Sequence, residues 1–257
     1  RLKKKDVAAL ILEPTGSHWG AHPLDIEYLR KANELTKETG TIFIMDEVIT
    51  GFRMSKGGAQ ELYNLQPDLS THAKILAGGL PGGCVAGKKE ILQQIEFSDD
   101  SDWNDAKKIA HQGTYNANPI SATAGTIALE IIRTGDDIER ADNLSNQLIL
   151  SLNQLFKDNK VRGRAWTVSS MWHLNFGYDN QKGLDELEQT HWIDKSPPEG
   201  VRPDLTLPLK WSLFNHGVDL FGTGGVLSSA HTDEDIDKTI AAFEKAIIDM
   251  RADGFSF

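Results

Sequence analysis

Cysteine is almost absent from this sequence, since Cys84 is the single one among 257 residues. One cysteine excludes an internal disulfide and offers no metal-ligand spacing. There is likewise no pairing at metal-ligand spacing among His72, His111, His173, His191 and His216. A chain without disulfides suits a reducing compartment, so we predict a cytoplasmic protein that binds no metal. We expect Cys84 itself to be a small buried residue.

Basic charge and long apolar runs are also scarce. The formal net charge is -10 and the pI is about 5.3, which excludes a nucleic acid partner because phosphate binding depends on clustered Lys and Arg. The one basic cluster, residues 1–5, is not followed by the apolar segment of a signal peptide. No stretch approaches the roughly 18 apolar residues of a membrane helix. We therefore predict neither a membrane segment nor a targeting signal.

Strand-like and helix-like segments alternate in the first half of the chain. Residues 7–12 form an apolar run that ends in a turn-rich loop at residues 13–20. Residues 23–39 carry apolar side chains at close to helical period, and Gly40 follows as a stop. The β-branched apolar run 41–48 is typical of a buried strand. Strand, helix and strand in this order predict a parallel βαβ unit and an α/β fold.

A helix is predicted to begin at Pro119, because Asn118 can cap it and proline is tolerated at the first helical position. We place the domain boundary at the end of this helix, with one domain at residues 1–133 and a smaller one at residues 134–257. The other expected elements are strands at 84–86 and 168–176, an exposed loop or short helix at 99–108, helices at 136–159, 209–217 and 233–250, the last capped by Thr232 or Asp233, and an irregular segment at 181–204.

Asp46 and Lys74 say most about function. Asp46 lies in the strand-like run 41–48, near the end where open α/β sheets bind ligands. Lys74 has apolar neighbours and precedes the glycine-rich turn 78–83. An amine in such surroundings can form a Schiff base with an aldehyde cofactor, and a carboxylate can hold a proton on a pyridine nitrogen. Taken alone, each residue has a structural alternative: a surface lysine, and an acid in a helix cap or surface ion pair.

Two further features adjoin this pair. Strand alternation places Val48 on the side of Asp46, against the ring, and Glu47 on the other side. In the loop 112–119, the hydroxyl of Thr114 and the backbone amides before a helix can bind a phosphate. An ordinary capping loop explains the same residues equally well.

Taken together, these motifs resemble the class III pyridoxal-phosphate-dependent aminotransferases, and within them the branch of glutamate-1-semialdehyde 2,1-aminomutase and related transaminases. The segments that carry the resemblance are 46–53, 57–60, 67–74, 78–81, 113–119 and 229–237.

This resemblance implies pyridoxal 5'-phosphate (PLP) as the cofactor. Lys74 would be the aldimine lysine and proton shuttle, Asp46 the partner of the pyridine nitrogen and Val48 the apolar support under the ring. Thr114 would bind the cofactor phosphate of the neighbouring subunit in a homodimer with a shared site, and Glu13 would face cofactor and substrate. The implied reaction is amino-group transfer on a small amino acid or amino-aldehyde.

The resemblance also implies a fold-type I transferase. Residues 1–133 would form the carboxyl-terminal portion of a large domain with a mixed or parallel sheet, and residues 134–257 a small α+β domain. The family pattern begins upstream of Arg1 with a Gly-Thr phosphate loop and an aromatic residue that stacks on the ring. We therefore expect a carboxyl-terminal portion that holds cofactor poorly and has no turnover alone.

Two alternatives stay open beside amino transfer. One is intramolecular amino migration, which Ile49 favours because many other class III transaminases have Gln there. The other is a non-catalytic chain, either truncated or dependent on a partner. The substrate is open too, because the loop 15–20 departs from the aminomutase pattern. No arginine near residues 227–229 matches the one that recognises a carboxylate in other branches.

Overall fold

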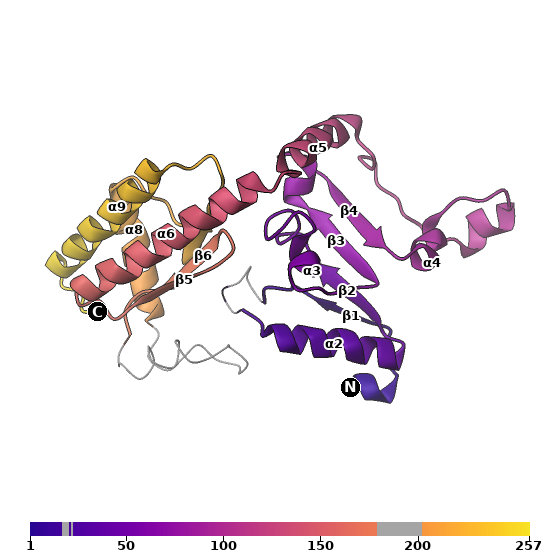
Figure 1. The fold of residues 1–257 in the computed structure, drawn as a ribbon, viewed down its shortest axis with the longest axis horizontal. Helices are drawn as coiled ribbons and strands as arrows, with labels where there is room; N and C mark the ends of the chain where they lie inside the picture. Colours follow the sequence, from indigo (N-terminus) through magenta and orange to yellow (C-terminus); the bar gives the residue numbers. More distant parts are fainter. Residues whose placement is uncertain (17–20, 22, 179–201) are drawn as a thin grey trace. The chain divides into compact units, whose positions relative to one another are not determined.

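The computed structural model describes residues 1–16, 21, 23–178 and 202–257 (Figure 1). These residues form two compact units. The first contains Arg1–Pro14 and Ile26–Thr134, and the second contains Thr15–Asp25 and Gly135–Phe257. The sequence placed the boundary between residues 133 and 134 and gave the loop before Ile26 to the first domain.

The first unit is built on a four-stranded sheet with the order β1-β2-β3-β4 (Figure 1). Its strands are β1 (Ala9–Leu12), β2 (Ile42–Asp46), β3 (Leu69–Ala73) and β4 (Gly83–Gly87). The first three run parallel, and β4 runs antiparallel to β3. The predicted α/β class and the mixed sheet are confirmed.

Helix α2 (Ile26–Thr39) forms the predicted crossover between β1 and β2 and packs on β2. It is amphipathic, and its buried face includes Leu29, which has no exposed surface. In β2 the burial alternates, so that Phe43 and Met45 are each only 1% exposed. This alternation fixes which side chains of β2 face the covered side of the sheet.

The expectation that Cys84 is buried is wrong, because its side chain is exposed. Cys84 lies in β4, which pairs with β3 and is an edge strand of the described sheet. Most of β4 is exposed, so Cys84 shares the exposure of the strand that carries it.

The first unit also contains several short helices. They are α3 (Gly58–Leu62, before β3), the 3-10 helices η1 (Leu2–Lys4), η2 (Lys74–Ala77) and η3 (Gln93–Ile95), α4 (Lys89–Leu92) and the π-helix η4 (Trp103–Lys107). Helix α5 (Pro119–Ile132) begins as predicted, because the Asn118 side chain accepts hydrogen bonds from the amides of Ile120 and Ser121.

The second unit packs helices against an antiparallel sheet with the order β5-β6-β7, which confirms the predicted α+β character. Its elements are α6 (Asp136–Asp158), β5 (Arg164–Val168), β6 (Met171–Asn175), η5 (Pro203–Leu205), α8 (Thr206–Asn215), β7 (Gly224–Val226) and α9 (Asp233–Ala252). One apolar core joins them, and its fully buried members include Leu152, Leu213 and Phe243.

The single strand predicted at 168–176 is instead the second half of a hairpin. Val168 pairs with Met171 across a turn at Ser169 and Ser170, and Ser169 has a φ of 54°. Most of the predicted irregular segment 181–204 lies outside the described residues.

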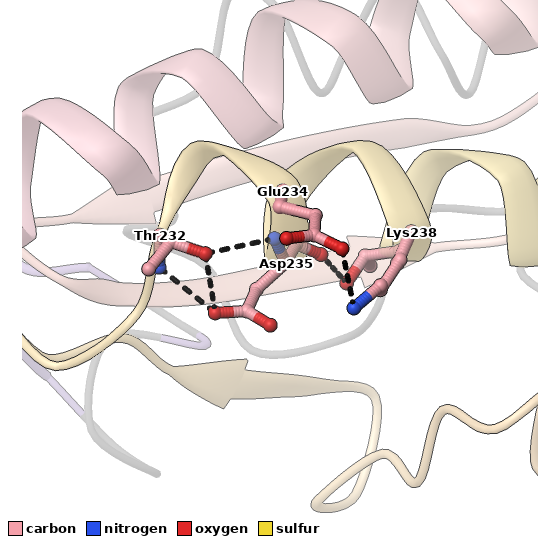
Figure 2. A network of polar contacts seen from close by, with 5 residues as sticks. Thr232, Glu234, Asp235 and Lys238 are labelled. Atoms are coloured by element: carbon pink, nitrogen blue, oxygen red, sulfur yellow. Dashed lines mark hydrogen bonds and ion pairs between the residues drawn. The ribbon is translucent and has the colours of Figure 1, made fainter.

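Helix α9 begins with a capping box (Figure 2). The Thr232 hydroxyl oxygen accepts a hydrogen bond from the amide of Asp235 at 3.3 Å, and Asp235 Oδ2 accepts one from the amide of Thr232 at 2.9 Å. These bonds satisfy donors that a helix start leaves unpaired, and the amide of Thr232 lowers the pKa of Asp235. A Glu234–Lys238 ion pair of 2.9 Å lies on the next turn. The predicted cap at Thr232 is confirmed.

No helix in the described part of the chain combines the length and the apolar character that crossing a membrane would require.

Candidate functional site

Asp46 is the last residue of β2, and its half-buried carboxylate is held by two hydrogen bonds. Its Oδ1 accepts one from the amide of Val48 at 3.0 Å and one from the hydroxyl of Thr71 at 3.2 Å. Both donors lie on the segments that end β2 and β3. Within the described residues, Oδ2 accepts no hydrogen bond. The carboxylate is therefore oriented by one oxygen and presents the other.

Lys74 follows β3 directly at the same edge of the sheet. Asp46 pairs with Thr71 in the parallel register of β2 and β3, and β3 ends at Ala73. Lys74 is exposed and has a φ of 52°, a left-handed conformation that is unfavourable for a residue with a Cβ. Such strain is concentrated at functional sites, where the surrounding structure imposes it.

Glu13 lies at this edge as well. It follows β1 directly, and Leu12 pairs with Met45 in the parallel register of β1 and β2. Glu13 therefore stands level with Asp46 and is half-buried. The sheet thus brings three predicted site residues to the carboxyl ends of three neighbouring parallel strands, which is where open α/β sheets bind ligands.

Val48 lies in the turn after β2 and is half-buried. Its amide donates a hydrogen bond to the Asp46 carboxylate, so this side chain stabilises the turn that carries Val48.

Glu47 has a structural role that the sequence did not predict. The sequence indicated only that its side chain lies on the opposite side of the strand from Asp46. Its side chain has no exposed surface, which agrees with the alternation of burial along β2. The carboxylate accepts hydrogen bonds from the Thr50 hydroxyl at 2.5 Å, the Ala59 amide at 2.9 Å and the Gln60 amide at 2.8 Å. A Cβ on Gly58 would lie 2.6 Å from Glu47 Oε2. Glu47 thus fixes the loop between β2 and α3 against the sheet.

His72 lies on the face of Glu47, because the registers of β2 and β3 put these two residues at the same level. Its Nε2 lies 2.9 Å from the hydroxyl of Ser70, and its ring is 5.6 Å from that of Phe52. Burial lowers the pKa of His72, which the negative charge of Glu47 partly offsets. This face is a packed support for the edge that carries Asp46.

Thr114 is exposed in a turn before α5, where the amide of Asn116 donates to the carbonyl of Gly113 at 3.0 Å. A surface hollow adjoins this turn. It is lined by residues of the η2–β4 connection and of the loop that leads into α5, among them Leu76, Pro81, Tyr115 and Asn118. Thr114 belongs to this loop rather than to the sheet edge of Asp46 and Lys74.

The donor set fits PLP better than a metal. An exposed primary amine and an oriented carboxylate on adjacent strands suit an aldehyde and a pyridine nitrogen. Among the described residues, no group of three His, Cys, Asp or Glu side chains lies so as to hold a metal ion.

Comparison with known proteins gives a family. The protein-family model described as Aminotransferase class-III matches residues 1–185. The chain is 32% identical over 250 residues to glutamate-1-semialdehyde 2,1-aminomutase of Archaeoglobus fulgidus, an alignment that covers 96% of this chain and 55% of that protein. It is 34% identical over 248 residues to glutamate-1-semialdehyde 2,1-aminomutase 2 of Brevibacillus brevis, covering 94% and 53%.

The fold agrees with these sequence matches. The crystal structure of an omega-transaminase from Sphaerobacter thermophilus superposes with a TM-score of 0.79 at 25% identity, covering 97% of this chain and 54% of that one. The predicted fold-type I architecture is confirmed. The chain spans about half the length of the curated relatives that it matches.

Proposed function

Because this chain belongs to the class-III aminotransferase family, we propose that it contributes the lysine and the carboxylate of a PLP-dependent enzyme that transfers amino groups. One observation supports these roles above all. Asp46 ends β2, Lys74 follows β3, and the two strands are hydrogen-bonded neighbours in parallel register. The two groups therefore lie at one edge of one sheet. Lys74 lies farther along the strand direction than Asp46, because it follows Ala73 whereas Asp46 is level with Thr71.

Each residue has a separate task. The Lys74 amine would hold the cofactor by its aldehyde carbon until the substrate amine displaces it, and the freed amine would then move a proton to and from the substrate carbon that carries the amino group. The Asp46 carboxylate would keep a proton on the pyridine nitrogen, and Val48 would support the ring. When bound, PLP withdraws electrons from that substrate carbon. Glu13 lies level with Asp46 and faces the cofactor and substrate.

The partners are proposed on the same basis. The substrate is a small amino acid or amino-aldehyde, in keeping with the names of the relatives. A second copy of the chain would place its Thr114 at the cofactor phosphate, and the exposure of this loop, with Tyr115 82% exposed, supports that role. We place the protein in the cytoplasm, since its lone cysteine makes no disulfide.

Intramolecular amino migration is the second candidate. The two curated relatives described above are named as glutamate-1-semialdehyde 2,1-aminomutases, which favours it. A transaminase needs an external keto acid as acceptor, whereas a mutase does not. In an enzyme that holds the whole family pattern, turnover that is independent of added keto acid would select the mutase.

Chemical trapping tests the central assignment. The chain is incubated with PLP, reduced with borohydride, digested and mapped by mass spectrometry. We expect the adduct on Lys74, its loss in Lys74→Ala, and its retention in Lys89→Ala, which removes an exposed lysine elsewhere in the same unit. An adduct spread evenly over the lysines, or one that survives Lys74→Ala at its original yield, would remove the basis for an enzymatic role.

A further inference from the structure

The turn that carries Lys74 lies against α5 at a contact made by two glycines. A Cβ built on Gly78 would come within 2.5 Å of the carbonyl oxygen of Ala124 in α5. A Cβ built on Gly125 would come within 2.4 Å of the carbonyl oxygen of Leu76 in η2. Each glycine thus faces the backbone of the other element, and neither position has room for a side chain.

Gly125 stands out within α5. It is the one residue of this fully described helix that is buried. Glycine is a poor helix former, and its use in a helix interior is explained by a close approach of backbone. The atoms that a side chain would meet at Gly125 are backbone atoms of residues 76 and 77, which cannot turn aside as a flexible side chain can.

The short helix η2 links this contact to the lysine. Two left-handed residues bracket it, Lys74 with a φ of 52° and Gly78 with a φ of 60°. The amide of Gly78, the residue that follows η2, donates to the carbonyl of Ile75 at 3.0 Å. The conformation of Lys74 is unfavourable by itself, so a neighbouring element must impose it. Strands β3 and β4 also contact this turn, but α5 packs on it most extensively, through Leu76 and Gly78.

We propose that the Gly78–Gly125 contact is a positioning device, in which α5 holds η2 so that the Lys74 amine is presented at the sheet edge beside Asp46. This inference rests on the proposed function, in which Lys74 holds the cofactor. Gly78 and Gly125 are positioning residues and touch neither cofactor nor substrate. A methyl or larger group at residue 125 would push η2 away from α5 and turn the amine from its place.

Selective labelling of lysines in the full chain tests this. After brief exposure to PLP and borohydride, the ratio of adduct on Lys74 to adduct on Lys89 is measured by mass spectrometry. Because both lysines are read in one sample, the ratio is independent of protein recovery. Hydrogen exchange of α2 is followed in parallel, and its protection reports that the unit is folded.

We expect the ratio to fall about tenfold or more in Gly125→Val, since a displacement of an ångström can remove a large part of a group's reactivity. Gly125→Ala should give a smaller fall in the same direction. Thr123→Ile adds bulk on the exposed side of the same helix and should leave the ratio unchanged. Exchange within η2 should quicken in the Gly125 variants while α2 stays protected.

Three results would overturn the inference. An unchanged ratio in folded Gly125→Val would show that the contact does not direct the lysine. An equal fall in Thr123→Ile would show that the effect is not specific to the contact. Loss of α2 protection in both Gly125 variants would make the contact a requirement of folding and not of position. A wild-type chain without preference for Lys74 would instead defeat the proposed function itself.

Discussion

The hydroxyl of Thr71 donates to Oδ1 of Asp46 across 3.2 Å, at the position where the backbones of β2 and β3 are in register. The ends of β2 and β3 are thus joined both by backbone pairing and by a hydrogen bond between side chains. The orientation of the carboxylate depends on β3, the strand that leads into Lys74, and not on β2 alone.

Replacing Asp46 by Asn separates the charge of this residue from its hydrogen bonds. Asn keeps an oxygen that can accept from the Val48 amide and the Thr71 hydroxyl, but it loses the negative charge. We expect the dissociation constant of PLP to rise about fivefold, because hydrogen bonds to charged groups are stronger by about 1 kcal/mol. An absorbance titration measures it. Asp105→Asn, a change at an exposed acid of the same unit, is the control. Equal affinity in Asp46→Asn would contradict the assigned role.

Glu47→Gln should destabilise the first unit. The carboxylate has no exposed surface and accepts three hydrogen bonds, and an amide nitrogen in place of one oxygen would face donors. We expect a loss of about 2 kcal/mol in the free energy of unfolding, measured by urea titration. Glu38→Gln, at an exposed position of α2, should change it by less than about 0.5 kcal/mol. A Glu47 variant as stable as the Glu38 variant would show that the buried carboxylate does not secure its loop.

Asp68 should make the stability of the first unit depend on pH. Burial acts to raise its pKa, but the Lys88 ammonium at 2.6 Å and the Phe43 amide at 2.7 Å bring it below its usual value of 3.8. A folded-state pKa below the unfolded one adds stability above the unfolded pKa, and this stability is lost as pH falls through the folded pKa. Asp68→Asn should therefore be less stable than the unchanged chain near pH 7, and the gap should close below about pH 4. Urea titrations across this range measure the gap. A gap of constant size would mean that the charge of Asp68 contributes nothing.

Sequence patterns predicted the elements whose signals are local. Helices α5 and α9 begin where Asn118 and Thr232 can cap them, since a cap and the helix that it starts are neighbours in the chain. The edge that gathers Asp46 and Lys74 was also predictable, because a parallel βαβ pattern fixes which strand ends meet.

Features that depend on distant contacts escaped prediction. All but the last residue of β6 is buried, so this strand lacks the alternation that marks a half-exposed strand, and the turn before it contains serines instead of glycine. Glu47 binds amides that its own strand does not supply, at Ala59 and Gln60. The position of Cys84 in an exposed strand depends on the order of strands in the sheet.

In a parallel sheet, the separation of two residues along the sequence and their distance in space are set by different parts of the structure. The number of residues between Asp46 and Lys74 is set by the loop, α3 and turn that connect β2 to β3 on one side of the sheet. The gap in space between these side chains is set by the ladder, in which Ile44 pairs with Leu69 and Asp46 with Thr71. Insertions or deletions in the connection are therefore tolerable in evolution, whereas shifting Asp46 by one place along β2, or Lys74 by one place from the end of β3, is not.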